Sequence, residues 1–168
     1  IVSWGNDGYG RVSNTPPGTT FNYVAAGIEH SLAIDGWSSA SSTQVGTGCI
    51  ATGTPPTLFA TPPVQGRDCM LVVGSFLPNT AGVILMGIQH TGIPLSPKCV
   101  AYFDLTLPTV PVFFSTDATG TWLSPLIPVS NSPSLTCMEL ALQAALANLP
   151  TAPFGMALSN GVWVKIGH

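Results

Sequence analysis

The sequence predicts an all-β protein, built as an antiparallel β-sandwich of about eight strands with a separate β segment in front of it. Two observations carry this prediction. The 168 residues include 18 glycines and 16 prolines, which favour short strands and turns over helices. Short apolar runs also alternate with turn signals at regular spacing, whereas a helical bundle could not accommodate so many prolines.

The composition divides the chain into three parts. Residues 1–36, punctuated by glycine and aromatic residues, are predicted to form a β segment of their own. Residues 37–48, WSSASSTQVGTG, are small and polar and are predicted to be a linker. Residues 49–168 are predicted to be a disulfide-bonded β-sandwich.

The sandwich strands are predicted from apolar runs bounded by Pro, Gly, Asn and Ser turns such as LPNTAG and NSPS. The predicted strands cover 56–61, 67–76, 82–90, 99–105, 109–116, 121–129, 135–146 and 156–166.

Residues 134–149, SLTCMELALQAALANL, fit two structures. Leu135, Met138, Leu142 and Leu146 would share one face of a helix, with Ser134 as its cap. The segment also alternates as a strand. We favour the strand, because a lone helix would interrupt the succession of strands and Pro150 bounds the segment.

The low charge excludes two classes of partner. Only 7% of residues are charged, against roughly 25% in a typical soluble domain. The four basic residues, Arg11, Arg67, Lys98 and Lys165, are scattered, so we expect no nucleic-acid binding. The longest apolar run, 82–88, is far shorter than the ~20 residues of a membrane-spanning helix, so we expect no membrane span.

Four cysteines are spread widely through the chain: Cys49, Cys69, Cys99 and Cys137. They form no CxxC motif, which argues against a zinc ribbon. In a chain poor in lysine they favour two disulfides, and hence an extracellular or cell-surface location. The alternative is four buried free thiols in a cytosolic protein.

No group of residues predicts catalysis. Asp104 and Glu139 are the only carboxylates that could form an acid–base pair, and most of the others lie in glycine-containing turns. The chain has no GxSxG elbow, and its histidines (His30, His90 and His168) lie in separate segments. We therefore expect no enzyme activity, no metal and no cofactor.

The tryptophans allow a further interpretation. Trp4, Trp37, Trp122 and Trp163 could form a platform on which sugar rings stack. We favour the alternative, in which Trp122 and Trp163 fill the sandwich core, Trp4 packs the N-terminal segment and Trp37 lies at the linker.

The N-terminal segment has a spaced pattern: Trp4-Gly5-Asn6, Gly8-Tyr9-Gly10, Phe21, Val24-Ala25-Ala26-Gly27, His30-Ser31-Leu32-Ala33 and Asp35-Gly36. With this pattern, residues 1–36 resemble one blade of the regulator-of-chromosome-condensation type of β-propeller. The resemblance implies a small sheet in which His30 is structural. Propellers of this type close with several blades, and a single small sheet cannot bury its own faces.

The rest of the chain carries another resemblance, in GTGC at 46–49, PLSPKC at 94–99, TDATG at 116–120, LIPVSNSPSL at 126–135 and LSNGVWVKIG at 158–167. Residues 45–168 resemble a Cys-containing β-sandwich module at the C-terminal ends of secreted proteins from planctomycete-like bacteria. The resemblance implies an extracellular structural or targeting role. It also implies a Cys49–Cys99 disulfide, since both match the module's cysteines and precede predicted strands. Cys69 and Cys137, each in a predicted apolar strand, are then expected to pair.

Together these features predict a non-enzymatic secreted subunit that self-assembles into an extracellular fibre, sheath or surface layer. Residues 1–36 would dock on an adjacent copy, head to tail, in a contact that does not close. The expected contact residues are Val2, Trp4, Phe21, Val24, Leu32 and Ile34. The alternatives are a carbohydrate-binding or adhesive surface module, and a noncatalytic tail of a larger secreted protein. The N-terminal segment could also fold back on its own sandwich.

Overall fold

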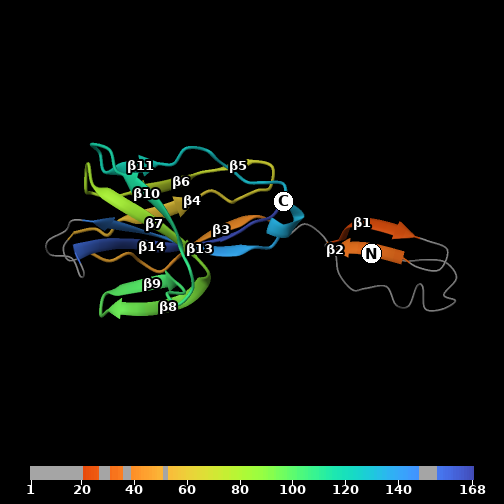
Figure 1. The fold of residues 1–168 in the computed structure, drawn as a ribbon, viewed down its shortest axis with the longest axis horizontal. Helices are drawn as coiled ribbons and strands as arrows, with labels where there is room; N and C mark the ends of the chain where they lie inside the picture. The colour runs from red at the N-terminus through yellow and green to blue at the C-terminus, as the bar shows by residue number, and fades with distance from the viewer. Residues whose placement is uncertain (1–20, 27–30, 36–38, 51–52, 148–154) are drawn as a thin grey trace. The chain divides into compact units, whose positions relative to one another are not determined.

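The computed structural model describes residues 21–26, 31–35, 39–50, 53–147 and 155–168. The chain divides into two compact units, Ile1–Ser38 and Ser39–His168. The fold is all-β and sandwich-like, and its sheets are antiparallel, as predicted (Figure 1).

The described residues of the first unit form a two-stranded antiparallel sheet of β1 (Phe21–Ala26) and β2 (Ser31–Asp35). Four of the expected contact residues lie in these strands, Phe21 and Val24 in β1 and Leu32 and Ile34 in β2. The other two, Val2 and Trp4, lie outside the described residues, and so do His30 and Trp37.

The described residues of the second unit form twelve strands and a short 3₁₀ helix. They are β3 (Ser41–Val45), β4 (Thr57–Ala60), β5 (Asp68–Cys69), β6 (Leu71–Gly74), β7 (Ala81–Gly87), β8 (Gln89–Ser96), β9 (Cys99–Phe103), β10 (Val110–Ser115), β11 (Thr121–Leu123), β12 (Ile127–Pro128), η2 (Pro133–Leu135), β13 (Glu139–Ala147) and β14 (Met156–Lys165).

A five-stranded sheet in the order β10-β7-β13-β14-β3 is the centre of this unit, and smaller sheets cover both of its faces. The main core, with Leu142 of β13 and Val73 of β6, lies between it and the three-stranded sheet β11-β6-β4. A smaller cluster, with Ala141 of β13 and Phe103 of β9, lies under the β8–β9 pair. Neighbouring residues of β13 thus face opposite layers, as the alternation of a strand requires.

This arrangement settles the segment that the sequence left between strand and helix. β13 is a strand, and its residues 141–146 are all buried, because the central sheet is covered on both faces. A strand buried on both faces has an almost continuous apolar sequence instead of a clean alternation. That is why residues 134–149 also fitted a helical pattern.

Other strand predictions need correction. The predicted linker at 37–48 is wrong for residues 41–45, because they form β3, which pairs with β14 at the edge of the central sheet. β8, a strand that contains Pro94, is not among the predicted strands. The predicted strands 67–76 and 121–129 are each divided into two short strands, β5 with β6 and β11 with β12.

The two edges of the central sheet differ in chemistry. β3 is made of uncharged polar residues and Val45. β10 carries Pro111 and exposes Phe113, of which 78% is accessible to solvent. Proline is tolerated in a strand mainly at an edge, because it has no N–H to donate to a ladder.

Candidate interaction surface

The outward face of the three-stranded sheet carries a row of apolar side chains. The register aligns Phe59 of β4 with Val72 of β6, and Val72 with Leu123 of β11. Phe59 is 48% exposed and Leu123 is 56% exposed, while Val72 is half-buried. We call these three residues the outer row. The strands that carry it, TLFA, LVVG and TWL, contain no charged residue.

The neighbouring positions in the same strands point inward, which fixes the direction of the outer row. Leu58 and Val73 are fully buried in the main core, and Trp122 packs against the same core. The ring of Trp122 lies 5.0 Å from that of Phe114, centroid to centroid, across the two sheets. Because successive side chains of a strand alternate, burying this inner row turns the outer row to solvent.

A buried amide holds β4 in place. The backbone N–H of Leu58 donates to Oδ1 of Asn160 at 2.9 Å, and Nδ2 of Asn160 donates to the carbonyl of Leu58 at 3.0 Å. The Asn160 side chain therefore pairs with the backbone of β4 as a neighbouring strand would.

Asn160 lies next to a β-bulge of β14, where the β13–β14 register shifts between Gln143 and Ala145. A bulge re-aims side chains, and here the neighbouring Ser159 hydroxyl accepts the N–H of Ala144 at 2.9 Å.

The turn from β10 to β11 positions β11, the strand that carries Leu123 of the outer row. The Asp117 carboxylate accepts N–H bonds from Thr119 at 2.8 Å and Thr121 at 3.0 Å, and the Thr119 hydroxyl at 2.7 Å. These bonds hold the pKa of Asp117 below its usual value, and the bond from the Thr119 hydroxyl has the largest effect. Gly120 has φ +82°, and a Cβ there would collide with the Ser75 carbonyl. The sequence TDATG is therefore a turn, as predicted for its aspartate.

The opposite layer, β8–β9, is held by a similar amide and by a disulfide. The N–H of Tyr102 donates to Oε1 of Gln143 at 3.1 Å, and Nε2 of Gln143 donates to the Val100 carbonyl at 2.9 Å.

The Cys49–Cys99 disulfide joins the first residue of β9 to the segment after β3. Cys49 also pairs with Leu158 of β14 in a β-bridge.

One of the two predicted disulfides is present in the structure and the other is not. Cys49–Cys99 is confirmed. The Cys69–Cys137 pairing is wrong, because both are free thiols in the structure. The predicted strand that was to contain Cys137 begins only at Glu139, so Cys137 lies in the preceding turn with φ 65° and is exposed. Cys69 lies in β5, whose strand partner is β12.

The carboxylates and histidines that the sequence offered as candidate catalytic or metal-binding groups make separate local contacts among the described residues. The Asp104 carboxylate accepts the N–H of Thr106 at 2.8 Å and its hydroxyl at 2.7 Å, and this turn lowers the pKa of Asp104. Glu139 opens β13 opposite Lys165. Nδ1 of His90 accepts the N–H of Gly92 at 3.1 Å. Within the described ranges, no group of three or more His, Cys, Asp or Glu residues could hold a metal ion.

The two described tryptophans pack inside the second unit. Trp122 packs on the main core, and Trp163 packs beside Ala141 and Phe103 in the smaller cluster. The indole N–H of Trp163 donates to the Tyr102 carbonyl at 3.4 Å. Packing is thus the role of both residues here, while Trp4 and Trp37 lie outside the described residues.

The chain has no match among protein-family models and no significant match among curated proteins. In the part of the chain that the structure describes, no helix is long and apolar enough to cross a bilayer.

Sequence reasoning missed the outer row. In TLFA the buried residues are Leu58 and Ala60, and the exposed ones are Thr57 and Phe59. Apolar residues fall on both faces, so alternation alone does not say which face is exposed. The useful signal was the absence of charge from all three strands, which is unusual for a sheet with one face in water.

Proposed function

We propose that the chain is a non-enzymatic extracellular structural subunit, and that it assembles head to tail through its N-terminal unit. In this proposal the N-terminal unit of one copy packs on the outer row of the next copy. The observation that carries the proposal is the outer row itself, Phe59, Val72 and Leu123, on a sheet face without charged residues.

The chemistry of the surface favours a second copy as the partner. Exposed apolar groups that adjoin one another mark interaction surfaces more often than isolated ones do. With 7% charged residues and a net charge of −3, copies of this chain repel one another weakly. A strongly charged partner would find no complementary charge on these three strands.

The N-terminal unit supplies a suitable partner for this face. Among the described strands, β1 and β2 pair only with each other. A two-stranded sheet is marginally stable in water unless it packs against another surface. Packing on an apolar sheet face would stabilise it, and the contact would repeat from copy to copy because the two surfaces differ.

The disulfide supports the location. Cys49–Cys99 is compatible with an oxidising compartment, where such bonds persist. An extracellular location is therefore part of the proposal.

Glycan binding is the alternative function. Its main support in the sequence was the set of four tryptophans, and two of these pack inside the second unit. A glycan module would remain small in solution and would change its tryptophan fluorescence with one class of sugar.

The test replaces one residue of the outer row. On this proposal the native chain sediments as a polymer, and Leu123→Lys, which places a charge in the proposed contact, should leave a monomer. Leu105→Lys is the matched control, because Leu105 is 47% exposed but lies outside the three-stranded sheet. Deleting residues 1–36 should have the same effect as Leu123→Lys in analytical ultracentrifugation. A polymer that persists in both variants would overturn the proposal.

A further inference from the structure

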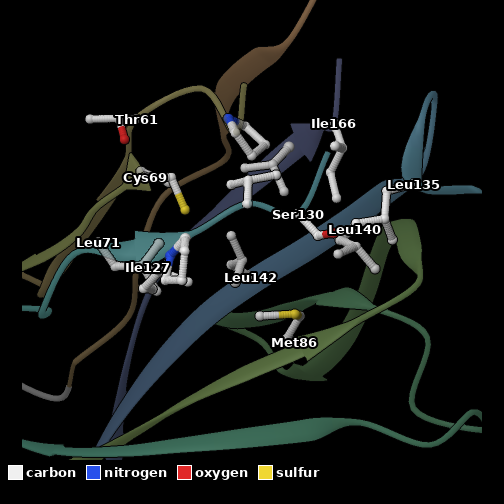
Figure 2. Close-up of a pocket in the computed structure, with 15 residues that line it drawn as sticks. Thr61, Cys69, Leu71, Met86, Ile127, Ser130, Leu135, Leu140, Leu142 and Ile166 are labelled. Carbon is white, nitrogen blue, oxygen red and sulfur yellow. The ribbon is translucent and has the colours of Figure 1, made fainter. Parts of the chain in front are cut away.

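We propose that the second unit binds a small uncharged apolar molecule, an aliphatic chain or a compact hydrocarbon skeleton, in a pocket at one end of its main core. The pocket opens between the central sheet and the layer formed by β4, β6, β5 and β12 (Figure 2). This site is independent of the outer row, which faces away from the core.

The pocket lies at the end of the main core, and side chains of the core form part of its wall. Leu71, Leu142 and Val164 belong to the buried core and also line the pocket. Met86 and Ile127 pack against the same core but remain half-buried. Apolar side chains are therefore left partly uncovered inside a concave site, where a ligand of the same chemistry would complete their packing.

The lining determines the charge of the ligand. None of the fifteen lining residues is charged, and the polar ones are Thr61, Ser130 and Cys69. The Thr61 hydroxyl already accepts the N–H of Met70 at 2.8 Å. Burial raises the pKa of the Cys69 thiol, so this group stays uncharged at neutral pH. A charged ligand would lose its hydration here without gaining a partner.

The size of the pocket bounds the ligand. Its volume is about 300 Å³. That is roughly twice the ~150 Å³ cavity that holds one benzene molecule, so about ten to twelve carbon atoms would fill it. Figure 2 shows Cys69 and Met86 on opposite sides of the pocket. The sulfur atoms of these residues are polarizable, and the methionine side chain adapts its shape, which suits a flexible chain.

The first test measures binding of a series of straight-chain alcohols, 1-butanol to 1-tetradecanol, to the full-length chain by calorimetry. Affinity should rise about fourfold for each added CH₂ group until the pocket is full. Met86→Ala enlarges the pocket and should extend the rise to longer alcohols. Met138→Ala is the matched control, because Met138 lies outside the lining and is exposed. Affinity that does not depend on chain length would overturn the proposal.

The second test uses the native thiols and needs no variant. With Cys49 and Cys99 in a disulfide, the thiols left for iodoacetamide are Cys69 in the pocket and Cys137 in an exposed turn. Saturating 1-decanol should slow the alkylation of Cys69 at least tenfold and leave the rate at Cys137 unchanged. Equal slowing of both thiols, no slowing of either, or a Cys69 that never reacts in the free protein would each contradict an open apolar pocket.

Discussion

The two layers that flank the central sheet are attached to it differently. On each side a buried amide reaches from the β13–β14 pair to an outer strand, Gln143 to β9 and Asn160 to β4. The β8–β9 side adds the Cys49–Cys99 disulfide, whereas the β4–β6–β11 side contains the apolar pocket and the free Cys69. One layer is thus fixed to the central sheet by a covalent bond, and the other is held by packing and hydrogen bonds alone.

The largest expected effect on stability comes from removing the Cys49–Cys99 disulfide, which only one of the two layers has. Replacing Cys49 and Cys99 together by serine opens a loop with a sequence separation of 50 residues. In the chain-entropy treatment this lowers the free energy of unfolding by about 4 kcal/mol. Urea denaturation measures the loss. Cys137→Ser is the control, because Cys137 is exposed and unpaired in the structure, and its free energy should change by less than about 0.5 kcal/mol.

The next effect concerns the amide of the layer without a disulfide. Asn160→Ala leaves the N–H of Leu58 buried without a partner, while the Leu58 carbonyl keeps only the Gln44 amide at 3.3 Å, and this costs about 1–3 kcal/mol. Hydrogen exchange should then accelerate at Leu58 far more than at Tyr102 in the opposite layer. Asn131→Ala, at an exposed position, should change neither. Equal acceleration at both amides would mean that the two layers open together.

The smallest effect is expected at acid pH. The pKa of Asp117 is lowered below its ordinary value of 3.8, so its bonds stabilise the folded state above that value. This contribution is lost as the pH falls below about 4 and through the lowered pKa, because protonation removes the negative charge that strengthens the bonds from Thr119 and Thr121. Thermal unfolding between pH 2 and pH 6 should show a steeper acid decline for the native chain than for Asp117→Asn.

The sequence predicted the features that depend on local chemistry. Glycine and proline marked the turns, and the apolar runs marked most strands, so the all-β antiparallel fold is confirmed. The Cys49–Cys99 pair is also confirmed, although it joins distant residues, because it was expected from the resemblance of residues 45–168 to the secreted module rather than from local chemistry. The Asp117 turn followed from a short-range preference of aspartate that needs no knowledge of the rest of the fold.

The features that depend on distant contacts could not be predicted. β3 is polar and resembles a linker, and it is a strand because β14 offers it an edge. Gln143 and Asn160 belong to residue types that are usually exposed, and only the three-dimensional arrangement shows that each meets a strand in another layer. The outer row and the pocket likewise exist only after the sheets are stacked.

Pro111 in the edge strand β10 has a consequence for the form that any polymer can take. The segment VPVFFS is uncharged and rich in residues that favour strands, a composition that promotes cross-β aggregation. Pro111 interrupts the hydrogen-bonding edge, so copies cannot stack through an unbroken ladder at β10. A polymer that grows through sheet faces would therefore lack the meridional fibre-diffraction reflection near 4.7 Å that characterises amyloid.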